Sequence, residues 1–260
     1  MQRVIPSKKE LIVVILAGGL GKRMCSDIPK VLHTIADEPM IVRVIKQAQK
    51  LNPSEILIVV GQYQEIIRST IAKYVPLSSI EFVFQKEPLG TGHALQCCHT
   101  FFIQHTYSRV LVLSGDVPLI RSETMQQLFE PEHAKCSIIT THLDDPTGYG
   151  RIVQDRSGFF THIVEEKDCT EEQRAITEVN CGIYLFDCIL ICKYLPKLER
   201  NNSQGEYYLT DLIHLAHHYE QTTVHRVLLP REQQLEVMGV NTPEQLAQLA
   251  DMYCFASILN

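Results

Sequence analysis

The sequence of 260 residues contains no apolar run that approaches the roughly 18 residues needed to span a membrane. Positive charge is not in excess either: 24 lysines and arginines against 30 aspartates and glutamates give a formal net charge of −6. A general nucleic-acid binder usually carries a basic face, so this balance argues against that class while leaving room for a local basic pocket. We therefore expect neither a membrane nor a nucleic acid as a partner.

Spacings typical of zinc, disulfide or triad chemistry are also missing. The nine cysteines form no CxxC pair, and the eleven histidines show no HExxH spacing. Cys188 and Cys192 lie one helical turn apart, which more often reflects core packing, because zinc needs three or four convergent ligands. No motif for a Ser/His/Asp triad is found. An odd number of scattered cysteines favours reduced thiols and a cytoplasmic protein.

The N-terminus has the basic start, apolar run and small residues of a secretory signal, in "MQRVIPSKKELIVVILAGG". We reject that interpretation because the apolar run has the length of a strand. Cleavage after it would also fall inside the glycine-rich loop that follows.

What the chain does contain is an alternation of short apolar runs with helix-length periodic segments. In the first half we predict strands at 11–16, 56–60, 80–85 and 109–116, and helices at 39–51, 64–74 and 91–102. Such alternation is typical of an α/β fold, Rossmann-like, with a mostly parallel sheet flanked by helices. From about residue 136 the pattern turns β-rich, with strands at 136–143, 150–155, 159–166 and 177–187, and helices at 170–176, 208–220 and 243–259.

The loops after the strands are the place to look for a site, because open α/β sheets bind ligands at the carboxyl ends of their strands. The first loop, "LAGGLGKRM", has neither the spacing of a Walker loop nor that of a dinucleotide fingerprint. Its glycines let backbone N–H groups approach an anion, and Lys22, Arg23 and Lys30 can add charge. A plain turn with solvated cations explains this loop equally well.

Two further loops carry the same kind of signal. "QKEPLGTGHAL" opens a helix with glycines, which suits a phosphate or a polar ring edge, although a simple capped helix start is as good an explanation. "RVLVLSGDVPLI" ends a buried strand in Asp116, a residue suited to hold Mg²⁺ on phosphate oxygens. The alternative for Asp116 is a cap on the next turn.

A series of longer motifs runs in order through most of the chain, from about Leu11 to Tyr253. They are "LAGGLGKRM…DIPKVLHTIADEPMI", "EPLGTGHAL", "SGDVPLI", "LDDPTGYGRIV", "IVEEKDCTEEQR", "EVNCGIYLFD", "NNSQGEYYLTDLI" and "VMGVNTPEQLAQL". The chain closely resembles the N-terminal uridyltransferase domain of the bifunctional bacterial N-acetylglucosamine-1-phosphate uridyltransferase / glucosamine-1-phosphate acetyltransferase. "DDPTGYGR" and "QGEYYLTD" carry this resemblance more specifically than any glycine pattern.

The resemblance implies an activity: Mg²⁺-dependent transfer from UTP to N-acetylglucosamine 1-phosphate, which would feed cell-envelope synthesis. It implies catalytic cations at Arg23 and Lys30, and metal ligation by Asp116 and Asn241. It also implies nucleotide contacts at Leu16, Ala17, Gly18, Gly19, Gly21, Gln85, Gly90 and Thr91. The residues implied around the sugar phosphate are Gly150, Glu165, Asn180, Tyr208 and Thr210.

We expect residues 1–260 to form a single domain, with a nucleotide-binding half over about 11–135 and a β-rich sugar-binding half over about 136–253. No internal or hexapeptide repeat occurs, so neither acetyl transfer nor the trimer built by the family's left-handed β-helix is expected. The chain departs from the family pattern at Gly18, Ser114 and Cys181. Because Cys181 would sit beside the sugar, another sugar 1-phosphate with UTP or dTTP stays open, as does a catalytically silent nucleotide-binding homologue.

Overall fold

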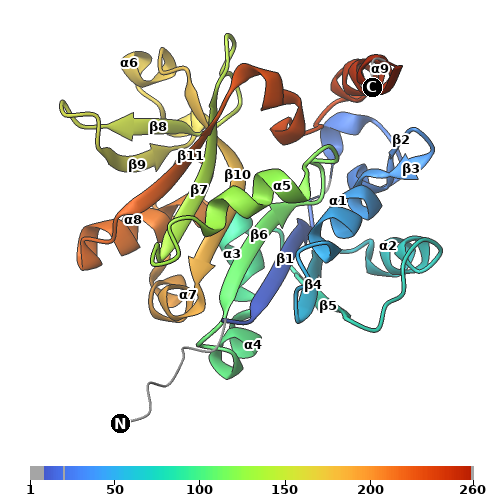
Figure 1. Ribbon diagram of the computed structural model, residues 1–260, viewed down its shortest axis with the longest axis horizontal. Helices are drawn as coiled ribbons and strands as arrows, with labels where there is room; N and C mark the ends of the chain where they lie inside the picture. The colour runs from blue at the N-terminus through green and yellow to red at the C-terminus, as the bar shows by residue number, and fades with distance from the viewer. Residues whose placement is uncertain (1–8, 20, 259–260) are drawn as a thin grey trace.

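The computed structural model describes residues 9–19 and 21–258, and these are built around a sheet in which the strands from the first half of the chain are parallel (Figure 1). β1 (Leu11–Ala17) pairs in parallel with β4 (Glu55–Val60) and β6 (Arg109–Ser114), and β4 pairs with β5 (Ile80–Phe84). Along β1, Val14 lies opposite Leu57 on one side and Val112 on the other. The predicted parallel, mostly apolar strands are therefore confirmed.

The second part of the chain extends the same sheet and makes it mixed. The strand order is β11-β7-β10-β6-β1-β4-β5, with β10 (Glu178–Asp187) antiparallel to β6 and to β7 (Cys136–His142). β11 (Val224–Leu229) runs parallel to β7 at the edge. β8 (Arg151–Gln154) branches from β10 and pairs with β9 (Phe160–Val164). The expected α/β fold with a β-rich lobe is confirmed in this mixed sheet.

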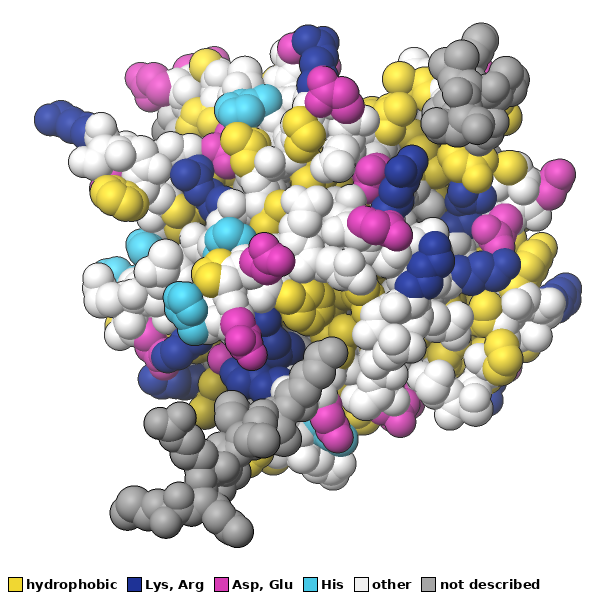
Figure 2. Space-filling model, in the orientation of Figure 1, with side chains coloured by type: hydrophobic (Ala, Val, Ile, Leu, Met, Phe, Trp, Pro, Cys, Tyr) yellow, Lys and Arg dark blue, Asp and Glu magenta, His cyan; other side chains and the backbone are white. Residues whose placement is uncertain are grey.

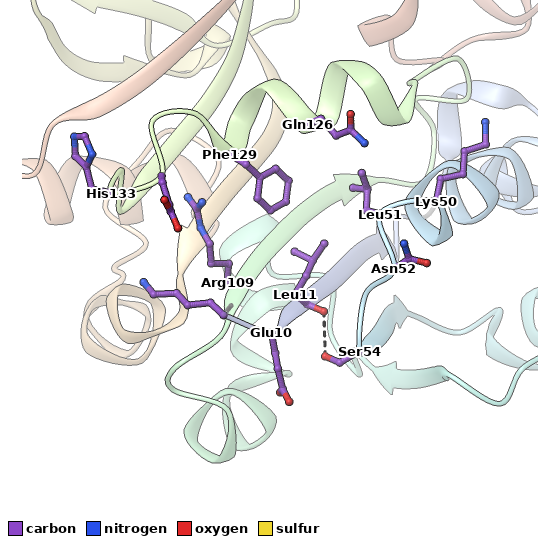
Figure 3. A pocket seen from close by; sticks show the side chains of 12 residues that line it. Glu10, Leu11, Lys50, Leu51, Asn52, Ser54, Arg109, Gln126, Phe129 and His133 are labelled. Carbon is purple, nitrogen blue, oxygen red and sulfur yellow. Dashed lines mark hydrogen bonds between the residues drawn. The ribbon is translucent and has the colours of Figure 1, made fainter. Parts of the chain in front are cut away.

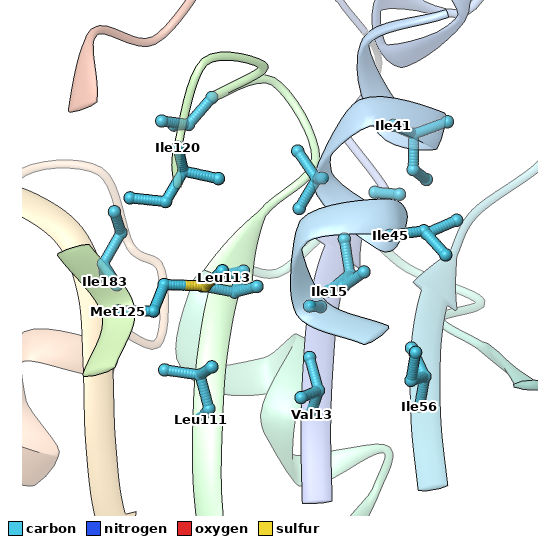
Figure 4. Packing of buried hydrophobic residues seen from close by; sticks show 14 of the residues in the cluster. Val13, Ile15, Ile41, Ile45, Ile56, Leu111, Leu113, Ile120, Met125 and Ile183 are labelled. Carbon is cyan, nitrogen blue, oxygen red and sulfur yellow. The ribbon is translucent and has the colours of Figure 1, made fainter. Parts of the chain in front are cut away.

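Helices cover both faces, because the strands expose apolar side chains to both sides in alternation. Val13 and Ile15 face a core with α1 (Met40–Gln49), α2 (Gln64–Ile71) and α5 (Ser122–Gln126). Figure 4 shows the part of this core that α1 and α5 cover. Ile12 and Val14 face the opposite core. Its helices are α3 (Thr91–Gln96), α4 (His99–Gln104), α7 (Cys188–Tyr194) and α8 (Leu209–Glu220).

A third, smaller cluster positions the loop that follows β1. Met24 packs with Ile35, which lies in the hairpin of β2 (Thr34–Ile35) and β3 (Glu38–Pro39), and with Leu249 of α9 (Pro243–Ile258). Met24 directly follows Arg23, so α9 and the hairpin fix the backbone that carries this cation. The neighbouring surface is charged in both signs, since Glu38 pairs with Arg43 and Lys46, and Figure 2 shows basic and acidic side chains mixed there.

The prediction of secondary structure was incomplete in one predicted helix and in several elements that it did not contain. The helix expected at 91–102 is two helices that meet at a turn at Cys97 and Cys98. The apolar spacing of Leu95, Cys98 and Phe102 continues through this turn, so periodicity could not reveal it. The helices α5 and α7 and the strand β11 were not expected. The helix α6 (Glu171–Arg174) was expected, within the acidic stretch 170–176.

Candidate active site

The loops after β1, β4, β5 and β6 meet at one edge of the sheet. The N–H of Gly115 donates to the carbonyl of Leu16 at 2.9 Å, which joins the ends of β6 and β1. The N–H of Gln85 donates to the carbonyl of Val60 at 2.8 Å, which joins the ends of β5 and β4. Parallel strands thus bring together the three loops that the sequence marked as candidates.

The first loop is tightly packed at Gly18 and has a left-handed backbone conformation at Gly21. A Cβ added to Gly18 would lie 2.6 Å from Oε1 of Gln85, closer than real side chains come. Gly21 adopts a φ of 59°, which L-residues rarely adopt, whereas a Cβ on Gly19 would meet nothing within 4 Å. Leu16 and Ala17 end β1 beside this turn. The side chain of Lys22, expected to be a supporting charge, lies outside the described residues.

The Gln85 and Gly90 segment forms the adjacent wall. Gln85 is buried, and its amide Nε2 donates to the carbonyl of Gly90 at 3.2 Å and lies 3.1 Å from Nδ1 of His93. Thr91 opens α3, but its hydroxyl oxygen accepts from the N–H of Leu209 at 3.1 Å. The Thr91 side chain therefore caps the start of α8 and ties this wall to the second half of the chain.

Four charged or polar side chains meet at the ends of β1 and β6. Arg23 Nη2 and Lys30 Nζ each donate to the side-chain oxygen of Asn241 at 3.0 Å. Lys30 Nζ also forms an ion pair with Asp116 Oδ2. The N–H of Val240 donates to the carbonyl of Asp116 at 2.9 Å, which holds the Asn241 loop against the β6 loop. The predicted catalytic and metal residues are thus brought together.

The donor set of Asp116 and Asn241 suits a hard divalent cation. Their oxygens converge on one positive centre, the ammonium of Lys30, and both side-chain types are oxygen donors. Mg²⁺ commonly takes one or two protein oxygens and completes its shell with water and substrate phosphates. Over residues 9–19 and 21–258 no cluster of three His, Cys, Asp or Glu is placed to hold a metal.

The residues expected around the sugar also come together, at the ends of β8, β9 and β10. The N–H of Asn180 donates to the carbonyl of Gly150 at 2.9 Å, and the Thr210 hydroxyl donates to Glu165 Oε1 at 2.9 Å. A Cβ on Gly150 would lie 3.5 Å from Glu165 Oε2 and 3.6 Å from Cβ of Asn180. Burial raises the pKa of Glu165, because its carboxylate is poorly solvated. A hydrogen-bond donor from a ligand would therefore stabilise the charged form.

Tyr208 differs from the expectation in one respect: its hydroxyl already has protein partners. It donates to Asp168 Oδ2 at 3.1 Å and accepts from Gln204 Nε2 at 2.9 Å. Burial, reinforced by the charge of Asp168, raises the pKa of Tyr208 to about 12 and keeps it a donor. Asn180 is similarly engaged, since its Nδ2 donates to the Tyr184 hydroxyl at 2.7 Å.

Sequence reasoning missed several residues of this region. Tyr149 lies close enough to the Gly239 backbone and to Asp116 for both to influence its pKa, which burial raises. Arg151, Glu166 and Asp168 bind the walls of the sugar side to one another. The motifs "DDPTGYGR" and "IVEEKDC" contain all four, but a run of charges in a sequence is usually a solvated surface, and only the fold reveals the partners.

A cavity of about 850 Å³ lies at the opposite end of the sheet, near the starts of β1 and β6 (Figure 3). Leu11, Leu51 and Phe129 line it together with polar residues. Two of the cations that line it, Lys9 and Arg109, pair with Asp187, at 2.9 and 3.7 Å, and the third is Lys50. Because Asp187 already balances part of this charge, this cavity is the weaker candidate for binding a phosphate-rich substrate.

Comparison with known proteins agrees with this geometry. Residues 12–227 match the family model described as "Nucleotidyl transferase". A protein of Acanthamoeba polyphaga mimivirus named "Probable UDP-N-acetylglucosamine pyrophosphorylase" is 44% identical over 240 residues, covering 91% of this chain and 94% of its own. "Bifunctional protein GlmU" of Burkholderia multivorans is 43% identical over 238 residues, covering 91% of this chain and 51% of its own.

The same relation holds for the protein of that name from Gloeothece citriformis, 41% identical over 243 residues, so the chain spans about half the length of these bifunctional relatives. A crystal structure of a Bacillus anthracis protein, assigned as a glucose-1-phosphate thymidylyltransferase, matches with a TM-score of 0.69 at 20% identity. It covers 93% of this chain and 94% of that protein, and at this identity it shows the fold alone. The matched family model and the identities show that the chain belongs to the nucleotidyl transferase family.

Proposed function

We propose that the chain transfers the uridylyl group of UTP to N-acetylglucosamine 1-phosphate, giving UDP-N-acetylglucosamine and pyrophosphate. The observation that carries the proposal is the convergence of Arg23, Lys30, Asp116 and Asn241 at the carboxyl ends of β1 and β6. The names of the mimiviral and bacterial relatives support the choice of nucleotide and sugar.

The reaction makes one bond and breaks one bond at the α-phosphorus of UTP. A phosphate oxygen of the sugar 1-phosphate attacks this phosphorus, and the bond from the α-phosphorus to the bridging oxygen breaks as pyrophosphate leaves. The attacking oxygen is already an anion, so no general base is required. The barrier lies in charge repulsion and alignment, which positioned cations and backbone donors reduce.

Within this scheme each charged residue has a role. Lys30, with a mostly buried side chain beside Asp116, neutralises phosphate charge near the reacting centre. Arg23 is exposed at the rim and neutralises the triphosphate as charge moves toward the leaving group. Phosphoryl transfer generally depends on a divalent ion that neutralises and aligns phosphate oxygens. We propose Mg²⁺, which Asp116 and Asn241 would hold.

The remaining residues would orient the two substrates. Leu16, Ala17 and the loop glycines would contact UTP together with Gln85, Gly90 and Thr91. On the other side, a buried acceptor or donor left without a partner costs about 1–3 kcal/mol, so a polar pocket can reject the wrong sugar. We assign that pocket to Gly150, Glu165, Asn180, Tyr208 and Thr210.

The cellular setting is part of the proposal. No helix in the described part of the chain is long and apolar enough to cross a membrane. All nine cysteines are free, which is typical of a reducing compartment. Both observations support a reaction in the cytoplasm. Transfer of an acetyl group is not proposed, because the match covers about half of the bifunctional relatives.

The test is pyrophosphate release by the purified chain with Mg²⁺, each nucleoside triphosphate and a panel of sugar 1-phosphates. We expect the highest kcat/KM with UTP and N-acetylglucosamine 1-phosphate. A higher value with dTTP or with glucose 1-phosphate would replace the proposed substrates. Release with no combination would support a silent, nucleotide-binding homologue, and the Asp116→Ala variant serves as the background control.

A further inference from the structure

Three acidic side chains lie within the four residues that follow β9, and each binds a different wall of the proposed sugar side. They lie on the turn Glu165–Asp168, which includes a short 3₁₀ helix (Glu166–Asp168). Glu165 binds Thr210 on α8, Glu166 binds the start of β8, and Asp168 binds the segment that precedes α8. One turn therefore joins three parts of the chain that are distant in sequence.

Glu166 holds the segment that carries Gly150. Its Oε2 accepts from Arg151 Nη2 at 2.6 Å and from the N–H of Gly148 at 3.1 Å. Its Oε1 accepts from Arg174 Nη1 at 2.9 Å. The Arg151 side chain is only 2% exposed, and its Nη1 donates to the carbonyl of Tyr149. These charge-assisted bonds in a buried setting fix the backbone on both sides of Gly150.

Asp168 holds the opposite wall in the same way. Its Oδ1 accepts from the N–H of Ser203 at 2.9 Å, and its Oδ2 accepts from the Tyr208 hydroxyl at 3.1 Å. Both oxygens of Asp168 are therefore used by the protein, as are both oxygens of Glu166. Because every oxygen of these two carboxylates has a protein partner, neither carboxylate is placed to serve as the main acceptor for a substrate hydroxyl.

Glu165 contrasts with its two neighbours. Its Oε1 accepts from Thr210, but its Oε2 has no hydrogen bond to any described residue and lies beside Gly150. A half-buried carboxylate oxygen without a protein partner can accept a hydrogen bond from a ligand, and sugar hydroxyl and amide groups are donors of the right kind. The turn thus presents one acceptor to the pocket and uses the other two to hold the pocket walls.

We propose that Glu166 and Asp168 are positioning residues that, without binding the sugar, hold Gly150 and Tyr208 in register with Glu165. They thereby determine the discrimination between N-acetylglucosamine 1-phosphate and sugar phosphates that lack the acetamido group. This inference rests on the proposed function for the identity of the sugar. A misplacement of about 1 Å can cost about 100-fold in rate, so small shifts of these walls are sufficient.

The experiment compares Glu166→Gln and Asp168→Asn with the wild type, using N-acetylglucosamine 1-phosphate and glucose 1-phosphate at saturating UTP, and then varying UTP. Glu171→Gln is the matched control, since Glu171 is on the same segment but its side chain is 96% exposed. We expect each of the two variants to raise KM for the acetamido sugar phosphate about tenfold or more. Its preference over glucose 1-phosphate should fall about tenfold, with KM for UTP within about twofold.

Two outcomes would overturn the inference: unchanged sugar preference in both variants, or an equal loss with every sugar and with UTP, which a merely structural role predicts. Thermal unfolding and UTP binding of each variant show that it is folded. If Glu166→Gln is not folded, Asp168→Asn alone decides, because it leaves the buried Arg151 pair intact. If the wild type prefers another sugar, the proposed function is wrong. The inference is then judged by whether the variants lose that preference.

Discussion

Asp211→Asn should stabilise the protein at neutral pH, because Asp211 is an acid placed where its charge is costly. It lies half-buried in the first turn of α8, and burial, followed by the charge of Asp168, raises its pKa from 3.8 to about 6. A difference of about two pH units corresponds to about 3 kcal/mol, at about 1.4 kcal/mol per unit. Partial exposure and the favourable helix dipole reduce this to about 1–2 kcal/mol.

The sign of the pH dependence follows from the direction of the pKa change. A carboxyl with a raised pKa in the folded state favours folding at low pH, where it is protonated in both states. That advantage is lost as the pH rises from 3.8 through about 6, where the folded protein must ionise the group. Removing the charge should therefore raise the free energy of unfolding fully above pH 6 and hardly at all as the pH approaches 3.8.

Urea unfolding followed by circular dichroism at pH 5, 6, 7 and 8 measures the effect, with Asp251→Asn on exposed α9 as the control. At pH 8 we expect a gain of about 1–2 kcal/mol, or about 2–8 °C in Tm. An equal gain at pH 5 and pH 8, or a loss at pH 8, would refute the burial argument.

Four further substitutions test the site. Gly90→Ala should destabilise the protein by about 2–4 kcal/mol, because φ is 107° and the new Cβ would lie 2.5 Å from the Tyr207 carbonyl. Gly19→Ala should cost far less stability. Equal losses of Tm in the two variants would refute this comparison. Asp116→Ala should abolish metal-dependent pyrophosphate release while leaving the Tm within a few degrees; near-normal turnover contradicts the metal assignment. Arg23→Ala should lower kcat strongly in steady-state assays, whereas a change confined to KM would count against its role.

The parallel half of the fold could be predicted because its strands are short, unbroken apolar runs buried on both faces. The direction of β10 could not, since "EVNCGIYLFD" is buried on both faces like the parallel strands although it runs antiparallel to β6 and β7. β11 escaped notice because His225 and Arg226 interrupt its apolar pattern. Strand direction and edge pairing depend on contacts between distant segments, which local pattern does not record.

The candidate site also has a part that the local sequence pattern could predict and a part that it could not. Glycine spacing and a strand-end carboxylate marked the loops of Arg23 and Asp116, but left a plain turn as an equal alternative. Lys30 and Asn241 are 211 residues apart, and only the family resemblance linked them before the structure placed them in contact. Arg151, Glu166 and Asp168 carried no local signal of their role, because their partners come from other strands and helices.

The two sides of the site rely on different parts of the backbone, and this separates their functions. The proposed phosphate side consists of loop glycines and cations at the ends of parallel strands. The proposed sugar side consists of side chains on an antiparallel extension, held by the turn Glu165–Asp168. Thr91, which caps α8, connects the two. Changes on the antiparallel extension can therefore alter which sugar is accepted while the phosphate chemistry at Asp116 stays the same.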